Sequence, residues 1–299
     1  MAQLLEAVHN RILLSDGGMG TQLQRSGLEP GGCGESWNIE HPARILAIHS
    51  KYVEAGSDCL ITNTFGASSI MLGRHDQKQR VREINRQGAI IARQAFGDGD
   101  GFVLGDIGPF GGLMEPYGEF SKQHVYDSFL EQAEGLISGG VDAVIIETQT
   151  SLEELGIAIE AAKDAGAPCI IGSVAFDLTR DETDLKTMMG VSPEDAAQFM
   201  DERNVDILGV NCGSGVDSLW AARAIERYKN VTDRPTMAQP NAGQPTLENL
   251  RVVYRQTPEE MGEQYKTLLN AEPNIVGGCC GTGPEHIRIF RQLVSERNC

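Results

Sequence analysis

The stretch Ala143-Val144-Ile145-Ile146-Glu147-Thr148-Gln149 decides the fold of this chain. Its first four residues are all apolar, and a strand without alternating polar residues is typical of a parallel sheet that is covered on both faces. The run turns polar at Glu147 and is followed by a candidate helix that begins near Leu152. We interpret the segment as one strand together with the helix that follows it.

The same unit recurs eight times along the chain. The apolar runs are Ile12-Leu14, Cys59-Thr62, Phe102-Leu104, Ala143-Ile146, Cys169-Gly172, Ile207-Val210, Pro235-Ala238 and Asn274-Val276. The candidate helices that follow them begin near Pro42, Asp76, Lys122, Leu152, Pro193, Asp217, Pro258 and Pro284. Several of these starts carry a proline in the first turn or a capping Asp or Ser, as helix starts do.

Eight strand–helix units in 299 residues predict an α/β fold, namely a single (β/α)8 TIM barrel that forms one domain over residues 1–299. The alternative is an open doubly wound sheet. Such a sheet usually has fewer units and a Gly-rich phosphate loop near its start, so the barrel is favoured. In a barrel the chemistry lies at the carboxyl ends of the strands, where this sequence is consistently polar.

Composition narrows the classes of partner. The formal net charge of −17 argues against nucleic acid and against an anionic membrane, because neither would be attracted to this chain. No run has the length of a membrane span, and Met1 to Ser15 lacks the apolar core of a signal peptide. The seven cysteines form no secreted-type framework, so we expect a reducing, cytoplasmic setting. The oligomeric state stays open, a homo-oligomer included.

Three cysteines follow strand ends. Cys279 and Cys280 are adjacent and flanked by glycines after the eighth apolar run, and Cys212 follows the sixth. A barrel would bring them to the same rim, where three thiolates would bind Zn²⁺ and leave one coordination position open, as in a catalytic zinc site. The alternatives are buried structural thiols or a strained vicinal disulfide. Cys33 and Cys299 carry no readable role.

Carboxylates and glycine amides lie at the same predicted rim. Asp16 follows the first apolar run, and Glu147 follows the fourth. Acids there would suit a substrate ammonium group, while the backbone N–H groups of Gly17 to Gly20 and Gly66 could receive a carboxylate. A salt bridge or a helix cap is the alternative use of these acids. Together the groups describe a pocket for an amino acid.

Zinc held by three thiolates is too electron-rich to polarise a carbonyl well. It can, however, bind a fourth sulfur and hold it deprotonated near neutral pH, whereas a free thiol with a pKa of about 8.5 stays mostly protonated. The chemistry that follows is alkyl transfer to a thiol. The predicted substrate is therefore an amino acid that carries a thiol.

At this point the chain resembles the homocysteine S-methyltransferase family, including the homocysteine module of cobalamin-dependent methionine synthase and the bacterial betaine–homocysteine methyltransferases. The matching stretches are Asp16-Gly17-Gly18 with Gly20-Thr21, Thr62 to Ala67, Gly105 to Pro109, Ile146-Glu147-Thr148, Gly209 to Cys212, Pro240 to Gly243 and Gly277 to Thr282.

The resemblance implies roles for individual residues. Cys212, Cys279 and Cys280 would bind Zn²⁺ and act in catalysis, with the homocysteine sulfur in the open position. Asp16 and Glu147 would hold the amino group, amides near Gly17 and Thr64 would help with the carboxylate, and Asn211 would belong to the substrate site. A methyl donor would then approach the zinc-bound thiolate and give methionine.

The methyl donor stays open between betaine, S-methylmethionine or S-adenosylmethionine, and the methyl-corrinoid of a separate protein. The mammalian betaine enzymes have a tyrosine where this chain has Gly66, so their aromatic cage is not carried over. Trp37, Tyr117 and Phe176 could build a different cage. Two further classes stay open: a thiol redox or persulfide-handling protein that uses the adjacent cysteines, and a non-catalytic zinc-binding barrel.

Overall fold

The computed structural model describes residues 2–248 and 251–298, and Cys299 lies outside them. Its parallel strands form one eight-stranded sheet that curls into a nearly closed barrel, in the order β1-β12-β9-β8-β5-β4-β3-β2. The strands are β1 (Leu13–Leu14), β2 (Cys59–Ile61), β3 (Phe102–Ile107), β4 (Ala143–Gln149), β5 (Ile170–Val174), β8 (Ile207–Asn211), β9 (Thr236–Gln239) and β12 (Ile275–Val276). The predicted α/β TIM barrel is confirmed.

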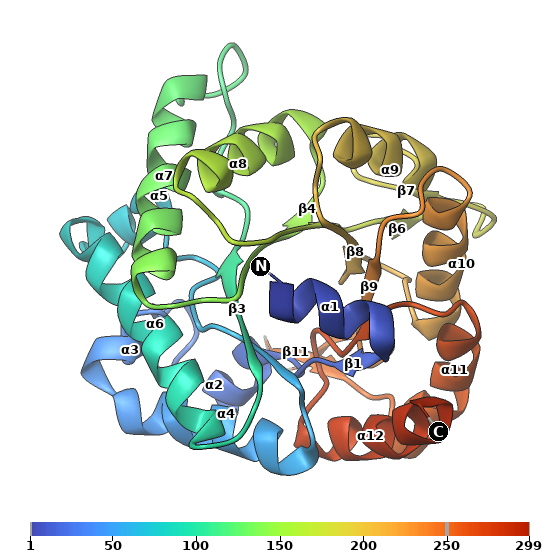
Figure 1. Ribbon diagram of the computed structural model, residues 1–299. Coiled ribbons are helices and arrows are strands. Elements are labelled where there is room, and N and C mark those ends of the chain that lie inside the picture. Colours follow the sequence, from blue (N-terminus) through green and yellow to red (C-terminus); the bar gives the residue numbers. More distant parts are fainter. Residues whose placement is uncertain (1, 249–250, 299) are drawn as a thin grey trace.

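The ring of helices around the barrel is visible in Figure 1. Its members are α4 (Pro42–Ala55), α6 (Val81–Phe96), α7 (Lys122–Ser138), α8 (Leu152–Asp164), α9 (Pro193–Glu202), α10 (Ser218–Lys229), α11 (Pro258–Asn270) and α12 (Pro284–Asn298). Ser192 and Thr257 cap α9 and α11 with full capping boxes, which explains why these starts could be predicted. The second predicted start, near Asp76, differs: Asp76 has a φ of 56° and a short 3-10 turn follows, so α6 begins only at Val81.

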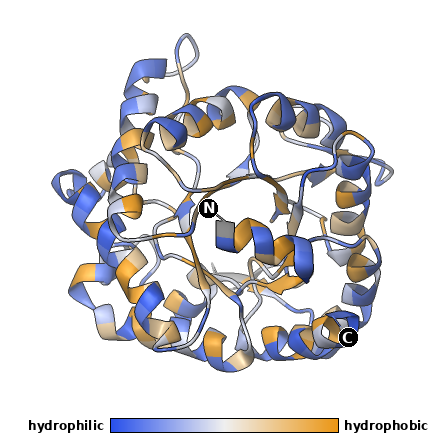
Figure 2. Ribbon diagram, in the orientation of Figure 1, coloured by the Kyte–Doolittle hydropathy of each residue, from blue (hydrophilic) through white to orange (hydrophobic). Residues whose placement is uncertain are grey.

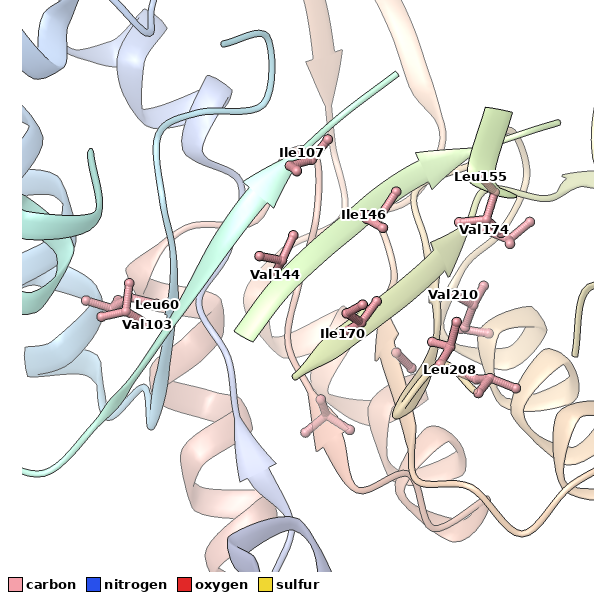
Figure 3. Close-up of a cluster of buried hydrophobic side chains, with 14 of the residues drawn as sticks. Leu60, Val103, Ile107, Val144, Ile146, Leu155, Ile170, Val174, Leu208 and Val210 are labelled. Carbon is pink, nitrogen blue, oxygen red and sulfur yellow. The ribbon is translucent and has the colours of Figure 1, made fainter. Parts of the chain in front are cut away.

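Alternate residues of each strand face two different cores. Cys59, Ile61 and Ile145 lie in a cluster inside the barrel. Leu60 and Val144, their neighbours in sequence, belong to a larger cluster between strands and helices, part of which Figure 3 shows. Figure 2 shows the strands as mostly hydrophobic and the ring helices as mixed. Both faces of the sheet are therefore buried, as the continuous apolar runs predicted.

A helix that the sequence analysis did not predict closes the amino-terminal end of the barrel. This helix, α1 (Ala2–Asn10), lies across the centre of the ring in Figure 1. Its Leu4 and Val8 are each 2% exposed and join the cluster inside the barrel. With this end filled, ligands have access to the barrel interior from the carboxyl ends of the strands.

Within the described residues no helix has the length and apolar character needed to cross a membrane.

A repeated side-chain bond joins the strands in pairs at this same end. The residue just before each even-numbered strand of the barrel is Asp or Asn, and its side chain accepts a hydrogen bond from a backbone N–H of the preceding strand. The pairs are Asp58 with Leu14 at 2.7 Å, Asp142 with Val103 at 2.7 Å, Asp206 with Ile170 at 2.8 Å and Asn274 with Thr236 at 2.9 Å. Asp58 also donates its own N–H to Leu14 at 2.6 Å, so it joins β1 to β2 where the barrel closes.

The connections at the carboxyl ends are elaborate. The first carries α2 (Met19–Arg25) and α3 (Trp37–Glu40), and the second carries α5 (Ser69–Gly73). Two others form hairpins: β6 (Asp177–Leu178) with β7 (Leu185–Lys186), and β10 (Pro245–Glu248) with β11 (Arg251–Tyr254). Residues 249–250 of the second hairpin lie outside the described part. These loops build the rim on which the predicted site lies.

Candidate active site

The structure brings the three predicted cysteines together. Cys212 follows β8, and Cys279 and Cys280 follow β12; their Sγ atoms all lie within 4.8 Å of one another. The Sγ atoms of Cys212 and Cys280 are 3.9 Å apart. No disulfide joins them, since all three are free thiols. The barrel topology thus supplies the proximity that the sequence spacing alone does not show.

Backbone shape, and not only the cysteine itself, creates this cluster. Cys212 has a φ of 56°, in the left-handed region, and Gly213 follows with a φ of 86°. A Cβ at Gly213 would lie 1.8 Å from the carbonyl oxygen of Phe176, so no other residue fits there. Gly281, with a φ of 81°, plays the same part after Cys280. Each cysteine loop therefore needs a glycine directly after it.

Asn241 fastens the two cysteine loops to each other. Its Oδ1 accepts a hydrogen bond from the N–H of Cys280 at 3.1 Å, and its Nδ2 donates to the carbonyl oxygen of Gly213 at 3.1 Å. The residue is 2% exposed. Asn241 lies in the stretch Pro240 to Gly243, which matches the family in sequence, but it was not among the predicted site residues. Its position after a predicted strand was the signal that could have found it.

The three thiols cannot all ionise without a cation beside them. Hydrogen bonds from the thiols of Cys212 and Cys279 lower the pKa of Cys280 to about 3. A hydrogen bond from Cys279 lowers the pKa of Cys212, but the bond to Cys280 and burial outweigh it and raise that pKa to about 11. The hydrogen bonds to Cys212 and Cys280, and then burial, raise the pKa of Cys279 well above its ordinary value. A divalent cation would supply the missing charge, and a cluster of thiolates is the donor set that zinc prefers, so these residues fit zinc.

Tyr254, at the end of the β10–β11 hairpin, lies beside this cluster. A Cβ at Gly281 would lie 2.3 Å from the Cβ of Tyr254, which places the tyrosine directly against the cysteine loop. After the two neighbouring thiols, its hydroxyl also lowers the pKa of Cys280. Tyr254 was not predicted from the sequence, because no local pattern shows that a distant hairpin packs on the cysteines.

The two predicted carboxyl groups lie at the same rim, and among the described residues neither forms an ion pair with Lys, Arg or His. The Asp16 carboxylate accepts hydrogen bonds from the Ile61 N–H at 3.0 Å and the Ser15 hydroxyl at 3.3 Å. Burial nevertheless raises the pKa of Asp16 to about 7. Burial, followed by the nearby Cys212 and Asp16, raises the pKa of Glu147 to about 8. An ammonium group between the two acids would favour their charged forms.

Strand β4 is distorted directly around and after Glu147. The register between β4 and β5 shifts between Ile146 and Gln149, and Thr148 has a φ of 61°. Asn211 stabilises this shape: its Oδ1 accepts from the Thr148 N–H at 2.9 Å, and its Nδ2 donates to the Thr148 hydroxyl at 2.8 Å. The same Nδ2 lies 4.0 Å from the Sγ of Cys279. Asn211 thus links the acid to the cysteines, while its predicted contact with substrate stays a prediction.

Gly17 and Thr64 lie near the site but are closely packed. A Cβ at Gly17 would lie 2.7 Å from the hydroxyl of Thr282 in the cysteine loop. The Thr64 hydroxyl lies 2.6 Å from that of Thr62 and donates to the carbonyl oxygen of Asp106 at 2.8 Å. The Thr64 N–H donates to the carbonyl oxygen of Thr62. Substrate contacts from Gly17 and Thr64 stay predictions. To bind substrate, Thr64 would have to give up one of its hydrogen bonds to Thr62 or Asp106.

The three aromatic residues suggested for a cage lie in different environments. Trp37 packs edge-on against His41 and under Arg44. Phe176 is fully buried against Tyr228, whereas Tyr117 is 88% exposed. They do not form one cage in this structure, because Trp37 and Phe176 pack onto neighbours of their own and the ring of Tyr117 lies in solvent.

Comparison with known proteins identifies the family. Residues 13–294 match the family described as homocysteine S-methyltransferase. The chain belongs to that family. The resemblance to the homocysteine S-methyltransferase family that was seen in the sequence is thereby confirmed.

The relatives of this family member include two methionine synthases. The chain is 33% identical over 311 residues to that of Mycobacterium leprae (strain TN) and 33% identical over 309 residues to that of Mycobacterium tuberculosis (strain ATCC 25618 / H37Rv). The alignments cover 99% and 98% of this chain but 25% of each relative. The chain therefore spans about a quarter of the length of the curated relatives it matches.

Solved structures show the same fold. The homocysteine methyltransferase MmuM from Escherichia coli, in its oxidized form, superposes with a TM-score of 0.78 at 21% identity, covering 97% of this chain and 99% of that chain. Its metallated form gives a TM-score of 0.76 at 22% identity, covering 98% and 99%. At this level of identity the structural similarity shows only that the two proteins share the barrel fold.

Proposed function

We propose that this chain is a zinc-dependent enzyme that transfers a methyl group to the thiol of homocysteine and releases methionine. The observation that carries the proposal is the cluster of Cys212, Cys279 and Cys280, whose Sγ atoms lie within 4.8 Å of one another at the rim that also holds Asp16 and Glu147. A thiol-binding site beside an acidic site is what a thiol-bearing amino acid requires. Membership of the family supports homocysteine as that amino acid.

Cys212, Cys279 and Cys280 would hold the zinc ion. When bound, zinc supplies a coordination position that keeps a substrate thiol deprotonated near neutral pH. Asn241 joins the loops of Cys212 and Cys280, and the Nδ2 of Asn211 contacts the thiol of Cys279 directly. These amide side chains position the thiols, and such outer contacts matter for metal affinity.

Asp16 and Glu147 would receive the substrate ammonium group. Each has a pKa that burial raises toward or above neutrality, so each gains from a cation that enters the pocket. Binding the amino end in this way orients the thiol toward the cysteines. The acids therefore act in binding and orientation, and the methyl group moves between donor and thiol.

The methyl donor remains between the onium compounds (betaine, S-methylmethionine and S-adenosylmethionine) and a methyl-corrinoid carried by a separate protein. The relatives named methionine synthase support the corrinoid candidate. This support rests on the resemblance of the sequence to the homocysteine module of cobalamin-dependent methionine synthase. Residues 1–299 would serve as one homocysteine-binding domain. A reducing compartment such as the cytoplasm suits it, because the three thiols must stay reduced to bind metal.

The test is an assay of methionine formation with reduced, zinc-loaded protein, homocysteine and each donor in turn, with methylcobalamin as the corrinoid probe. We expect methionine from one donor class, with turnover lost in Glu147→Gln. Zinc without turnover on every donor would point to a non-catalytic zinc-binding barrel. Absence of zinc from freshly reduced protein would point instead to a thiol redox or persulfide-handling protein.

A further inference from the structure

Asp106 is a buried acid that the proposed function does not use. It lies on β3, two residues after Leu104, which belongs to the cluster inside the barrel. On the neighbouring strand β4 it pairs with Ile145, which is also inside, and Glu147 lies two residues further on. Because successive side chains of a strand alternate in direction, Asp106 and Glu147 face the same interior.

Hydrogen bonds hold the backbone of Asp106, whereas one oxygen of its carboxyl group has no partner among the described residues. Its N–H donates to the hydroxyl of Thr62 at 2.9 Å, and its carbonyl oxygen accepts from Thr64 at 2.8 Å and from Gln132 at 3.2 Å. The residue is 4% exposed. Its Oδ1 atom is buried and has no hydrogen-bond partner among the described residues. A buried polar atom without a partner is costly, so this oxygen is poised to accept a bond from a ligand.

The surroundings of this carboxyl group are acidic. Burial, and then the charges of Glu147, Glu35 and Asp16, raise its pKa well above the ordinary value. No ion pair of the part of the chain described here joins Asp106 to Lys or Arg. Asp16 and Asp106 also flank the end of β2, since Asp16 accepts the Ile61 N–H and Asp106 donates its own N–H to Thr62. The acids thus come from β3, β4 and the end of β1, around β2.

We propose that Asp106 is a further substrate-binding residue, which together with Asp16 and Glu147 receives the ammonium group of homocysteine. A primary ammonium group has three N–H donors and no acceptor, so three carboxyl groups around it match its hydrogen-bonding capacity. Charge-assisted bonds of this kind are the strong ones. This inference rests on the proposed function, and it names the third partner of the same substrate group.

The test compares homocysteine with the analogue in which hydrogen replaces the amino group. Asp106→Asn keeps the shape of the side chain and removes its ability to carry negative charge. By titration calorimetry on zinc-loaded protein, we expect the Kd for homocysteine to rise about 10-fold or more, and the Kd for the analogue to change less than about 2-fold. A purely structural role would weaken both ligands equally.

Glu154→Gln is the matched control. Glu154 is half-buried, with its pKa raised to about 7 by burial, but its Oε1 already accepts the N–H of Phe110 at 2.7 Å. The Glu154→Gln substitution should leave the Kd values for homocysteine and for the analogue unchanged. If Asp106→Asn does not fold, Asp106→Ser removes the same charge and should give the same selective loss.

The outcomes separate the two proposals. Equal losses for both ligands, or none for either, with wild-type protein that binds homocysteine, would overturn the role of Asp106 and leave the proposed function standing. Wild-type protein that binds zinc but not homocysteine would overturn both.

Discussion

The Oδ1 atom of Asn241 accepts a hydrogen bond from the backbone N–H of Cys280 at 3.1 Å. These residues follow β9 and β12, which are neighbours in the barrel. Through its Nδ2, Asn241 also holds the loop that contains Cys212. One buried amide therefore determines how the cysteines of two strands meet.

Removing that amide should weaken the metal site without unfolding the barrel. We expect Asn241→Ala to lower zinc affinity by about 10- to 100-fold, the range found when outer contacts of metal ligands are lost. Competition with a chromophoric chelator would measure this. The exposed Asn230→Ala is the matched control. Unchanged affinity in Asn241→Ala would show that the cysteine loops hold their shape alone.

The three cysteines should each be needed for metal. We expect about one zinc per chain in the reduced wild-type protein, and loss of most of it when Cys212, Cys279 or Cys280 is changed to Ala, because two thiolates hold zinc far more weakly than three. Metal analysis of gel-filtered protein would check this. Cys33→Ala, which alters a free thiol outside the cluster, should keep its zinc. Full zinc in all three variants would contradict the proposed site.

Asp16 should make the stability of homocysteine-free protein depend on pH. Its pKa in the folded state is about 7, above the ordinary 3.8, so the stabilisation by its bound proton is complete below about pH 4 and is lost as the pH rises through about 7. Asp16→Asn cannot ionise. We expect its stability advantage over wild type to grow by on the order of 2 kcal/mol between about pH 5 and about pH 8, while homocysteine binding is lost.

Urea unfolding at several pH values would measure this, with the exposed Asp98→Asn as control. A constant difference between Asp16→Asn and wild type across that range would show that the Asp16 carboxyl group keeps its charge in the folded protein. A variant that is less stable at every pH would show that its hydrogen bonds to Ile61 and Ser15 dominate.

Asp206 should matter for stability and not for chemistry. Its carboxylate accepts the Ile170 N–H at 2.8 Å at the amino-terminal end of the barrel. We expect Asp206→Ala to lower the free energy of unfolding by about 1–3 kcal/mol, the cost of leaving a buried N–H unpaired. Asp206→Asn should cost far less, because Asn274 makes the equivalent bond to Thr236 at 2.9 Å. Urea unfolding would measure both, and zinc content should not change.

Much of the fold followed from local patterns. Each of the eight apolar runs contains or overlaps an observed strand, because a strand buried on both faces must be apolar at successive positions. Pro193 and Pro258 begin helices where the sequence predicted, since caps and proline act within one turn. The three cysteines could be placed together because parallel strands of a barrel send their carboxyl ends to one rim.

The features of the site that could not be predicted depend on contacts between residues that are far apart in the sequence. Asn211 and Cys279, 68 residues apart, meet only when β8 and the β12 loop are packed in one barrel. The raised pKa of Asp16 and the unpaired Oδ1 of Asp106 follow from burial, which a sequence does not show. By itself the sequence determined the eight strands of the barrel, most of the surrounding helices and the zinc-binding cysteines that we propose, because each depends on residues that are close in sequence. Only the tertiary structure decided which polar side chains already have hydrogen-bond partners within the protein and which can still bind a ligand. The reason is that hydrogen bonding and desolvation depend on contacts between distant segments.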